Sequence, residues 1–259
     1  MKKGVYKSIC LVALLSCSVL GGCSMLGNPP KGLEANRSIK EYDETSWESN
    51  RAVLIAAEQS QNYELMLSTG REVIAKDPSN ALARIYTARA MTRTGDPSQA
   101  LRTLSYIEKI DKYPEAVLEK ARAQISLGAY ADASSSLEAL YKTLYKNNDK
   151  DERELFRETK KLLAVSKALN QDFPASFNVF EELLAENDEP TVRYNYARAL
   201  MFNNDYAKAY ETLKPIIERY PKAKNAAAAA LIKLGQTDKA RAVLGKDISD
   251  DDFNNLLTL

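Results

Sequence analysis

The sequence predicts an all-α protein, a solenoid of about five to six stacked helical hairpins over residues 41–259. Three observations lead to this fold class. A unit of about 33 residues recurs along the chain, small residues recur at two fixed places within the unit, and a polar turn followed by an aromatic residue separates the two helices of several units. Each hairpin can therefore be placed from its own residues.

The small residues form two series. The first is spaced by 34, 33, 43, 33 and 31 residues and consists of Met66, Ala100, Ala133, Ser176, Ala209 and Ala240. The second lies 12 residues upstream of the first five and consists of Leu54, Ala88, Ala121, Ala164 and Ala197. Small side chains let two helices approach closely, so we expect these residues to form the buried seam of each hairpin.

The turns of the hairpins follow in chain order. The first precedes Tyr63, the third follows Gly128 and the fifth follows Asn204, while Pro78 and Pro221 mark ends of units. Large rings begin the second helix of four units and are expected to fill the space against the next hairpin: Tyr63, Tyr130, Phe173 and Tyr206. The tail from residue 247 to residue 259 is expected to form a capping segment through Phe253, Leu256 and Leu257.

The spacing of 43 contains about ten additional residues near positions 146–152. This charged segment predicts either an exposed loop or an extension of the flanking helices. Asn147, Asp149, Asp151 and Glu158 imitate the ligand spacing of a calcium loop. Glu152, however, stands where such a loop requires glycine, so we predict a solvated connection and no metal site.

The first 22 residues have the layout of an export signal, with basic Lys2, Lys3 and Lys7 ahead of a short apolar run. Residues 1–22 are therefore predicted to be a signal peptide. Cys23 follows two glycines after the apolar run and would be the only cysteine of the mature chain. Residues 23–40 contain Gly and Pro and are predicted to be a flexible tether that spans on the order of 20 Å.

Composition excludes several classes of function. The 36 basic and 35 acidic residues become 33 and 35 once three lysines leave with the signal, and this near-neutrality argues against nucleic-acid binding. The chain has no histidine, which removes histidine-dependent nucleophiles and zinc sites. It also has no glycine-rich phosphate-binding motif. We predict no catalytic residue, no metal and no cofactor.

Function is then expected on a surface that binds proteins. In stacked hairpins the first helices line the concave side, and counting from the small residues places one set of side chains there: Arg51, Ile85, Arg89, Leu118, Arg122, Lys161, Tyr194 and Arg198. A groove of guanidinium and apolar groups suits a peptide that bears carboxylates. The alternative is that these arginines only solvate the helices.

Two parts of the sequence resemble known families. The repeats from residue 47 to residue 245 resemble degenerate tetratricopeptide repeats, and Leu20-Gly21-Gly22-Cys23 resembles the box at which bacterial lipoproteins are cleaved and lipidated. Lipidation at Cys23 would anchor the protein to a membrane. Ser24, rather than an aspartate, resembles the sorting residue of lipoproteins at the periplasmic face of the outer membrane.

Taken together, these features resemble the tetratricopeptide-repeat lipoproteins of the tight-adherence (Tad, or Flp) pilus system, most clearly at residues 63–80 and 205–221. That resemblance implies a non-enzymatic scaffold, or pilotin, that assists assembly of the pilus secretin and contacts other pilus assembly components. Three alternatives remain open at this level: a pilotin of type IV pili, a lipoprotein of β-barrel assembly, and an adaptor of peptidoglycan enzymes.

Overall fold

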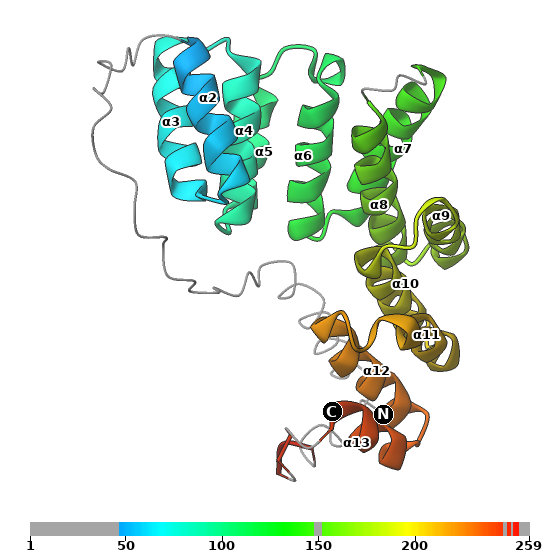
Figure 1. Ribbon diagram of the computed structural model, residues 1–259. Coiled ribbons are helices and arrows are strands. Elements are labelled where there is room, and N and C mark those ends of the chain that lie inside the picture. The colour runs from blue at the N-terminus through cyan, green and yellow to red at the C-terminus, as the bar shows by residue number, and fades with distance from the viewer. Residues whose placement is uncertain (1–46, 148–151, 246–247, 250, 254–259) are drawn as a thin grey trace, which may run out of the picture. The chain divides into compact units, whose positions relative to one another are not determined.

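The computed structural model describes residues 47–147, 152–245, 248–249 and 251–253. Within these ranges all regular elements are helices (Figure 1), so the predicted all-α class is confirmed. The described chain forms two compact units, residues 47–108 and residues 109–253. The prediction of one solenoid with a capping segment over residues 41–259 stays a prediction, and the described residues divide into their two compact units after Glu108.

The boundary falls where the chain departs from the regular repeat. The helix before it, α5 (Pro97–Ser105), has nine residues. After it, Lys109 adopts the left-handed conformation with φ 52°, and the short 3-10 helix η2 (Ile110–Lys112) precedes the next hairpin. This irregular segment carries no residue of either small-residue series, which is why the repeat pattern did not reveal it.

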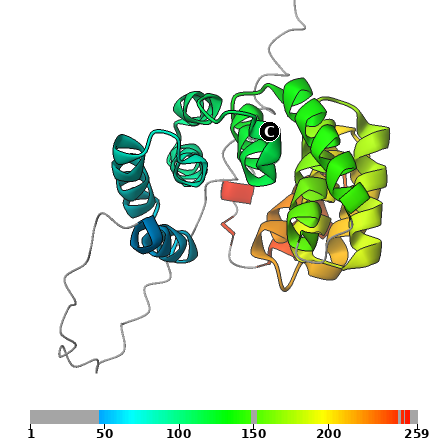
Figure 2. The same ribbon diagram turned by 90° about the horizontal axis from the view of Figure 1, so that it is seen from above.

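Each unit is built from antiparallel hairpins whose two helices lie side by side in Figure 1 and Figure 2. The first unit contains α2 (Trp47–Gln59) with α3 (Tyr63–Lys76), and α4 (Ala81–Arg93) with α5. The second unit contains α6 (Pro114–Ser126) with α7 (Tyr130–Asn147), α8 (Arg153–Leu169) with α9 (Phe173–Glu186), α10 (Pro190–Phe202) with α11 (Tyr206–Leu213) and the short η3 (Lys214–Ile216), and α12 (Pro221–Lys233) with α13 (Thr237–Leu244). The described residues thus hold six hairpins, as the repeat count predicted.

The two small-residue series form the buried seams, which confirms the predicted register. All eleven side chains are 0% exposed. The series meet directly in the hairpin of α8 and α9, where Ser176 Oγ donates a hydrogen bond of 2.7 Å to the carbonyl oxygen of Ala164. A helix backbone accepts a bond from the neighbouring helix at this distance only because both side chains are small.

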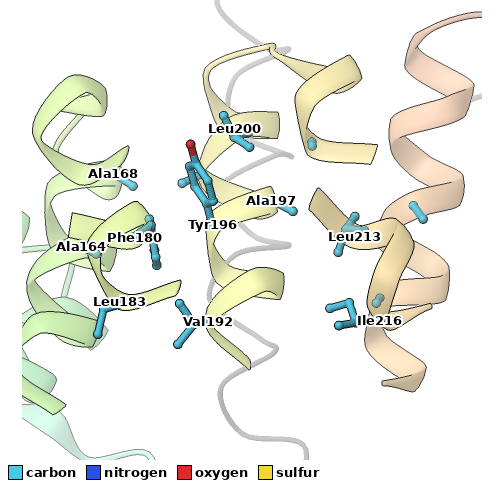
Figure 3. Close-up of a cluster of buried hydrophobic side chains, with 14 residues drawn as sticks. Ala164, Ala168, Phe180, Leu183, Val192, Tyr196, Ala197, Leu200, Leu213 and Ile216 are labelled. Atoms are coloured by element: carbon cyan, nitrogen blue, oxygen red, sulfur yellow. The ribbon is translucent and has the colours of Figure 1, made fainter. Parts of the chain in front are cut away.

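Larger side chains fill the remaining core. In the second unit Phe180 and Leu183 of α9 pack with Val192, Tyr196 and Leu200 of α10 (Figure 3). Each fully buried side chain of this size contributes about 1.5–3 kcal/mol relative to exposure. The rings at the starts of second helices also pack as expected in part, since Phe173 lies 5.8 Å from Phe202 of the next hairpin.

One backbone motif closes all six hairpins. In each turn the residue two places before the second helix has a positive φ, between 55° and 93°: Gln61, Gly95, Gly128, Gln171, Asn204 and Gly235. The next residue donates its N–H to the carbonyl five residues back, as in the 2.9 Å bond from Ala129 to Gln124. This is the Schellman arrangement, which satisfies carbonyl groups at the end of the first helix.

The ten additional residues largely extend the two flanking helices. Helix α7 has 18 residues where α9 has 14, and α8 has 17 residues where α10 has 13. Of the two expected forms, the helix extension is therefore confirmed, while residues 148–151 lie outside the described part. In the tail, Phe253 is 7% exposed and packs against the last hairpin, and residues 254–259 lie outside the described part.

Candidate protein-interaction surface

The side chains expected to bind a partner lie on what we call the first-helix face. In each unit separately, this face comprises the positions three residues before and one residue after the small seam residue of each first helix, which is α2 and α4 in the first unit and α6, α8 and α10 in the second. The structure places these side chains in three different environments. Arg51 of α2 is exposed, two apolar residues are buried, and the others contact neighbouring charged or aromatic groups.

Ile85 and Leu118 are core residues, which corrects their expected availability. They are 2% and 4% exposed. Each lies three residues before its seam alanine, Ala88 or Ala121, and positions three apart share one side of a helix. The apolar stripe of a packed helix is about 100° wide or more, so an apolar residue at this position joins the core. These two residues cannot contribute contact area to a partner while the hairpins remain folded.

Arg89 of α4 is held within its own unit. Its guanidinium pairs with the Glu58 carboxylate of α2 and lies 5.5 Å from the centre of the Tyr86 ring, and the side chain is 16% exposed. The aliphatic stem is therefore covered, and the charge is balanced by a carboxylate of the neighbouring hairpin.

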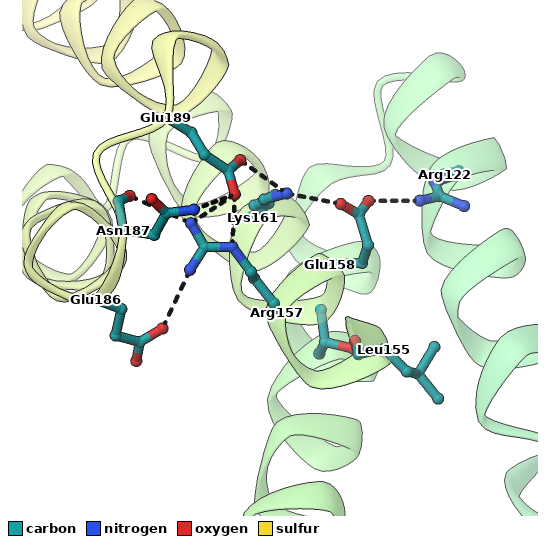
Figure 4. Close-up of polar contacts among 9 residues, drawn as sticks. Arg122, Leu155, Arg157, Glu158, Lys161, Glu186, Asn187 and Glu189 are labelled. Carbon is teal, nitrogen blue, oxygen red and sulfur yellow. Dashed lines mark hydrogen bonds and ion pairs between the residues drawn. The ribbon is translucent and has the colours of Figure 1, made fainter. Parts of the chain in front are cut away.

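Arg122 of α6 begins a chain of ion pairs in the second unit (Figure 4). It donates to Glu119 Oε1 at 2.6 Å. It also donates to Glu158 Oε2 of α8 at 3.0 Å, the bond that Figure 4 draws. Lys161 of α8 continues the chain, with its Nζ 2.9 Å from Glu158 Oε1 and 3.1 Å from Glu189 Oε2. Two of the residues expected on the face, Arg122 and Lys161, are thus joined through one carboxylate.

The chain of ion pairs ends at the connection between α9 and α10. Arg157 of α8 donates from Nε to Glu189 Oε1 at 2.8 Å and from its terminal nitrogens to the Asn187 carbonyl at 3.3 Å and to Glu186 at 3.4 Å (Figure 4). Lys160, whose side chain is 3% exposed, also pairs with Glu186. The whole ion-pair network therefore links α6, α8, the end of α9 and the residue directly before α10.

The network is balanced in charge. Its members are four basic and four acidic side chains: Arg122, Arg157, Lys160 and Lys161 with Glu119, Glu158, Glu186 and Glu189. Burial opposes the charge of Glu189, but the hydrogen bonds from Lys161 and Arg157 lower the pKa of Glu189 below its ordinary value. Burial likewise opposes the charge of Lys161, while its bonds to Glu158 and Glu189 raise the pKa of Lys161. A carboxylate of a partner would have to replace one of these internal carboxylates.

An aromatic cluster follows on α10 and α12. The rings of Tyr194 and Tyr220 lie 5.4 Å apart at an angle of 57°, and the guanidinium of Arg198 lies 5.6 Å from the centre of the Tyr194 ring. Burial raises the pKa of Tyr220, with Tyr194 adding to the effect and Arg198 opposing it. Tyr194 and Arg198 were predicted on this face, whereas Tyr220 was not, because its only signal was its place directly before Pro221 at the start of a first helix.

The described ranges contain little that suggests a metal site or a membrane-spanning helix. In them, no three His, Cys, Asp or Glu side chains are grouped so that they could hold a metal ion. Glu158, the last residue of the calcium-like spacing, is paired with Arg122 and Lys161. None of the helices described is both long and apolar enough to cross a bilayer. Cys23, the expected lipidation site, lies outside the described residues.

Comparisons with known proteins agree with the hairpin geometry. Residues 170–247 match the family model described as anaphase-promoting complex, cyclosome, subunit 3, and residues 81–105 match a tetratricopeptide-repeat model. The described part of the chain is a tetratricopeptide-repeat fold. Among curated proteins, none matches the sequence.

Solved structures show the same tetratricopeptide-repeat fold at low sequence identity. A tetratricopeptide repeat protein from Parabacteroides merdae ATCC 43184 is 12% identical, with a TM-score of 0.60 over 85% of each chain. A putative kinesin light chain from Podosopora anserina, with nearly identical tetratricopeptide-like repeats, is 18% identical, with a TM-score of 0.55 over 69% of this chain and 95% of the other. At these identities the likeness concerns the fold alone.

Proposed function

We propose that this protein is a non-catalytic scaffold that binds other proteins through its tetratricopeptide repeats. Such repeats typically mediate protein–protein contacts. The observation that carries the proposal is that successive first helices of the second unit keep polar and aromatic side chains only partly buried, at repeat-related positions: Arg122, Lys161, Tyr194 and Arg198. This surface is positioned by rigid seams and does not depend on flexible loops.

The ion-pair network determines how this surface would bind. Its guanidinium and ammonium groups already have carboxylate partners. The binding free energy from a partner's carboxylate is therefore only the difference between its ion pair and the internal ion pair that it replaces. The Tyr194–Tyr220 cluster with Arg198 combines aromatic area with a cation and is the better anchor, because Tyr and Arg are enriched among residues that dominate binding energy. A partner segment with an aromatic side chain fits this cluster.

A change of Arg198→Glu tests the face, and Lys214→Glu serves as a matched control. Lys214 lies in η3 beside the second helix of the same hairpin, and its side chain is 61% exposed. Arg198→Glu should weaken binding of an isolated partner, and Lys214→Glu should not, while both proteins keep their helical signal. Equal dissociation constants for Arg198→Glu and the parent would remove the first-helix face from the proposal. Arg122→Glu is a poor test because it places a third carboxylate beside Glu119 and Glu158.

We further propose that the scaffold is lipidated at Cys23 and stands at the periplasmic face of the outer membrane. The support is the sequence Leu20-Gly21-Gly22-Cys23 after a short apolar run, followed by Ser24. Two or three acyl chains would hold the protein at the surface, since each buried methylene contributes about 0.8 kcal/mol. The segment of residues 23–40 would keep the repeats on the order of 20 Å from the lipid.

The most specific form of the proposal is that the bound partner is a subunit of a pilus secretin of the tight-adherence type. Its support is the combination of a lipobox with a short run of tetratricopeptide repeats. A secretin subunit bound by a lipid-anchored scaffold gains effective concentration at the membrane where its ring forms. No catalytic residue is needed for this role.

Deletion of the gene tests the secretin proposal. Membrane-inserted secretin multimers and surface pili should fall together, whereas Cys23→Ala should misplace the multimers and leave partner binding intact. Normal multimers and pili in the deletion strain would refute the secretin assignment. A general loss of outer-membrane β-barrel proteins would instead favour a role in β-barrel assembly, and the protein-binding scaffold would stand in either case.

A further inference from the structure

Two successive junctions between hairpins of the second unit are built from repeat-related residues. At the junction between α8 and α10, the position three residues before the seam alanine of α8 is Lys161, and the residue directly before α10 is Glu189. At the junction between α10 and α12, the same two positions hold Tyr194 of α10 and Tyr220 directly before α12. In each junction the two side chains contact each other, and we call them the junction pair.

The two junction pairs differ in chemistry. Lys161 Nζ lies 3.1 Å from Glu189 Oε2, and Arg157 of α8 donates from Nε to Glu189 Oε1 at 2.8 Å (Figure 4). The rings of Tyr194 and Tyr220, whose centres lie 5.4 Å apart, form the other pair. An ion pair can exchange its partner for water or another charged group, whereas two rings are held by the area that they remove from water. The α8–α10 junction is therefore closed by groups that can be released at little cost in exposed apolar area.

A buried contact between α9 and α10 can serve as the pivot of the α8–α10 junction. Phe180 and Leu183 of α9 pack in one cluster with Val192 and Tyr196 of α10 (Figure 3). The members of this cluster from α8 are small or partly buried: Ala164, Ala168 and Val165. Release of Glu189 would therefore leave the α9–α10 contact in place and allow α8 to move away from the start of α10.

We propose that the α8–α10 junction is a hinge, closed by a latch that consists of the ion pairs of Glu189 with Lys161 and Arg157. The junction between α10 and α12 is fixed by its ring pair. With the latch closed, the hairpin of α8 and α9 holds one position relative to α10. With the latch released, α8 moves relative to α10 about the buried α9–α10 contact, while α10 and α12 keep their arrangement.

The latch gives the first-helix face a defined response to charge. A carboxylate that binds Lys161 or Arg157 displaces Glu189 and opens the hinge, whereas an aromatic side chain that binds at Tyr194 and Tyr220 leaves it closed. High salt acts in the same direction as a carboxylate because it screens the ion pairs, and its effect is smaller because these side chains are partly buried. The hinge does not depend on the identity of the partner.

The test measures two distances in the full chain by electron paramagnetic resonance of paired nitroxide labels. The three cysteines of the chain are first changed to alanine, so that labels attach only at introduced cysteines. Labels at Glu154→Cys and Thr191→Cys report on the α8–α10 junction. Labels at Thr191→Cys and Asn225→Cys report on the α10–α12 junction. All three positions are exposed, so the labels should not disturb the core.

Glu189→Gln keeps the shape of the latch residue and removes its charge. In this variant the distance between labels 154 and 191 should lengthen by about 1–2 Å, the usual size of a helix shift, while the distance between labels 191 and 225 should equal that of the parent. High salt should lengthen the first distance of the parent by a smaller amount. Lys161→Met combined with Glu189→Met replaces the junction pair by apolar side chains, and it should keep the parent distance and abolish its response to salt.

A matched control and three outcomes decide the question. Glu211→Gln removes an exposed carboxylate that pairs with Lys214 of the same hairpin at 3.6 Å, and it should change neither distance. Equal distances between labels 154 and 191 in Glu189→Gln and the parent would refute the latch. Equal changes at both junctions would also refute it, because they would show general loosening. If Glu189→Gln loses the helical signal of the parent, the salt series of the parent decides, and a distance that stays constant from low to high salt overturns the inference.

Discussion

The six hairpin turns offer a sharp test of the fold, because equivalent positions are filled by glycine in three turns and by larger residues in the others. Gly128 has φ 79° and Gln171 has φ 64°, in successive hairpins of the second unit. A residue with a Cβ in this conformation costs about 1–2 kcal/mol, whereas glycine costs about 0.4–1 kcal/mol through the entropy of the unfolded chain. The two substitutions Gly128→Ala and Gln171→Gly should therefore have opposite effects.

The structure allows the magnitude to be estimated. A Cβ added at Gly128 would meet no atom within 4 Å, so the cost of Gly128→Ala is conformational and not steric. We expect this variant to be about 1 kcal/mol less stable than the parent. Gln171 is exposed, so Gln171→Gly loses little contact and should be about 1 kcal/mol more stable. Asn204→Gly should change stability less, because asparagine tolerates the left-handed region better than glutamine does.

Urea unfolding followed by far-ultraviolet circular dichroism measures both effects. The midpoints should move in opposite directions at an unchanged slope, since neither change alters the surface exposed on unfolding. Repeat proteins can lose two-state behaviour, so the comparison should use one transition that all variants share. Midpoints that move in the same direction would refute the argument from backbone conformation. Free energies of unfolding that both stay within about 0.3 kcal/mol of that of the parent would also refute it.

The remaining predictions concern the seams, the ion pairs and the anchor. Ala133→Leu and Ala209→Leu should each cost about 1–3 kcal/mol because both seam positions are 0% exposed, and a thermal midpoint equal to that of the parent would show that the seam has room. Acidification should destabilise the second unit: the pKa values of Glu181 and Glu189 lie below their ordinary 4.5, so their contribution is fully present above that value and is lost as the pH falls through the lowered pKa. Unfolding midpoints at about pH 3 and about pH 6 measure this loss, and Glu189→Gln should reduce it. Cys23→Ala should release the protein from the membrane fraction, and persistent labelling by a fatty-acid analogue in that variant would contradict lipidation at Cys23.

The seams were predictable from the sequence because they depend on spacing. Ala88 and Ala100, or Ala121 and Ala133, are small residues at a constant separation, and close helix packing requires small residues at the places where two helices meet. The turns were also located correctly, since polar residues there interrupt the apolar pattern. The left-handed conformation of Gln171 was not indicated, because glutamine carries no preference for it and the surrounding helices impose it.

The first-helix face was harder to predict for two physical reasons. The position three residues before the seam lies at the border of the core, so burial depends on the side chain: Leu118 is buried, while Lys161 extends to Glu158 and Glu189. Ion pairs between helices depend on which rotamers long side chains adopt. The sequence indicated that Arg122 lies near the surface, but not that Glu119 and Glu158 neutralise it.

The extension of α7 and α8 also has a consequence for how such a chain can change over time. Each helix gains four residues, close to the 3.6 of one full turn, so side chains on either side of the added turn are offset by only about 40° around the helix. Paired one-turn insertions in neighbouring antiparallel helices are thus neutral for the seam. A chain without residues 144–147 and 153–156 would retain the register of Ala133 and Ala164, and it would lose the exposed ring of Tyr145 together with the buried side chain of Leu144, which is 3% exposed. A repeat protein can in this way acquire or discard exposed side chains with little change to its core.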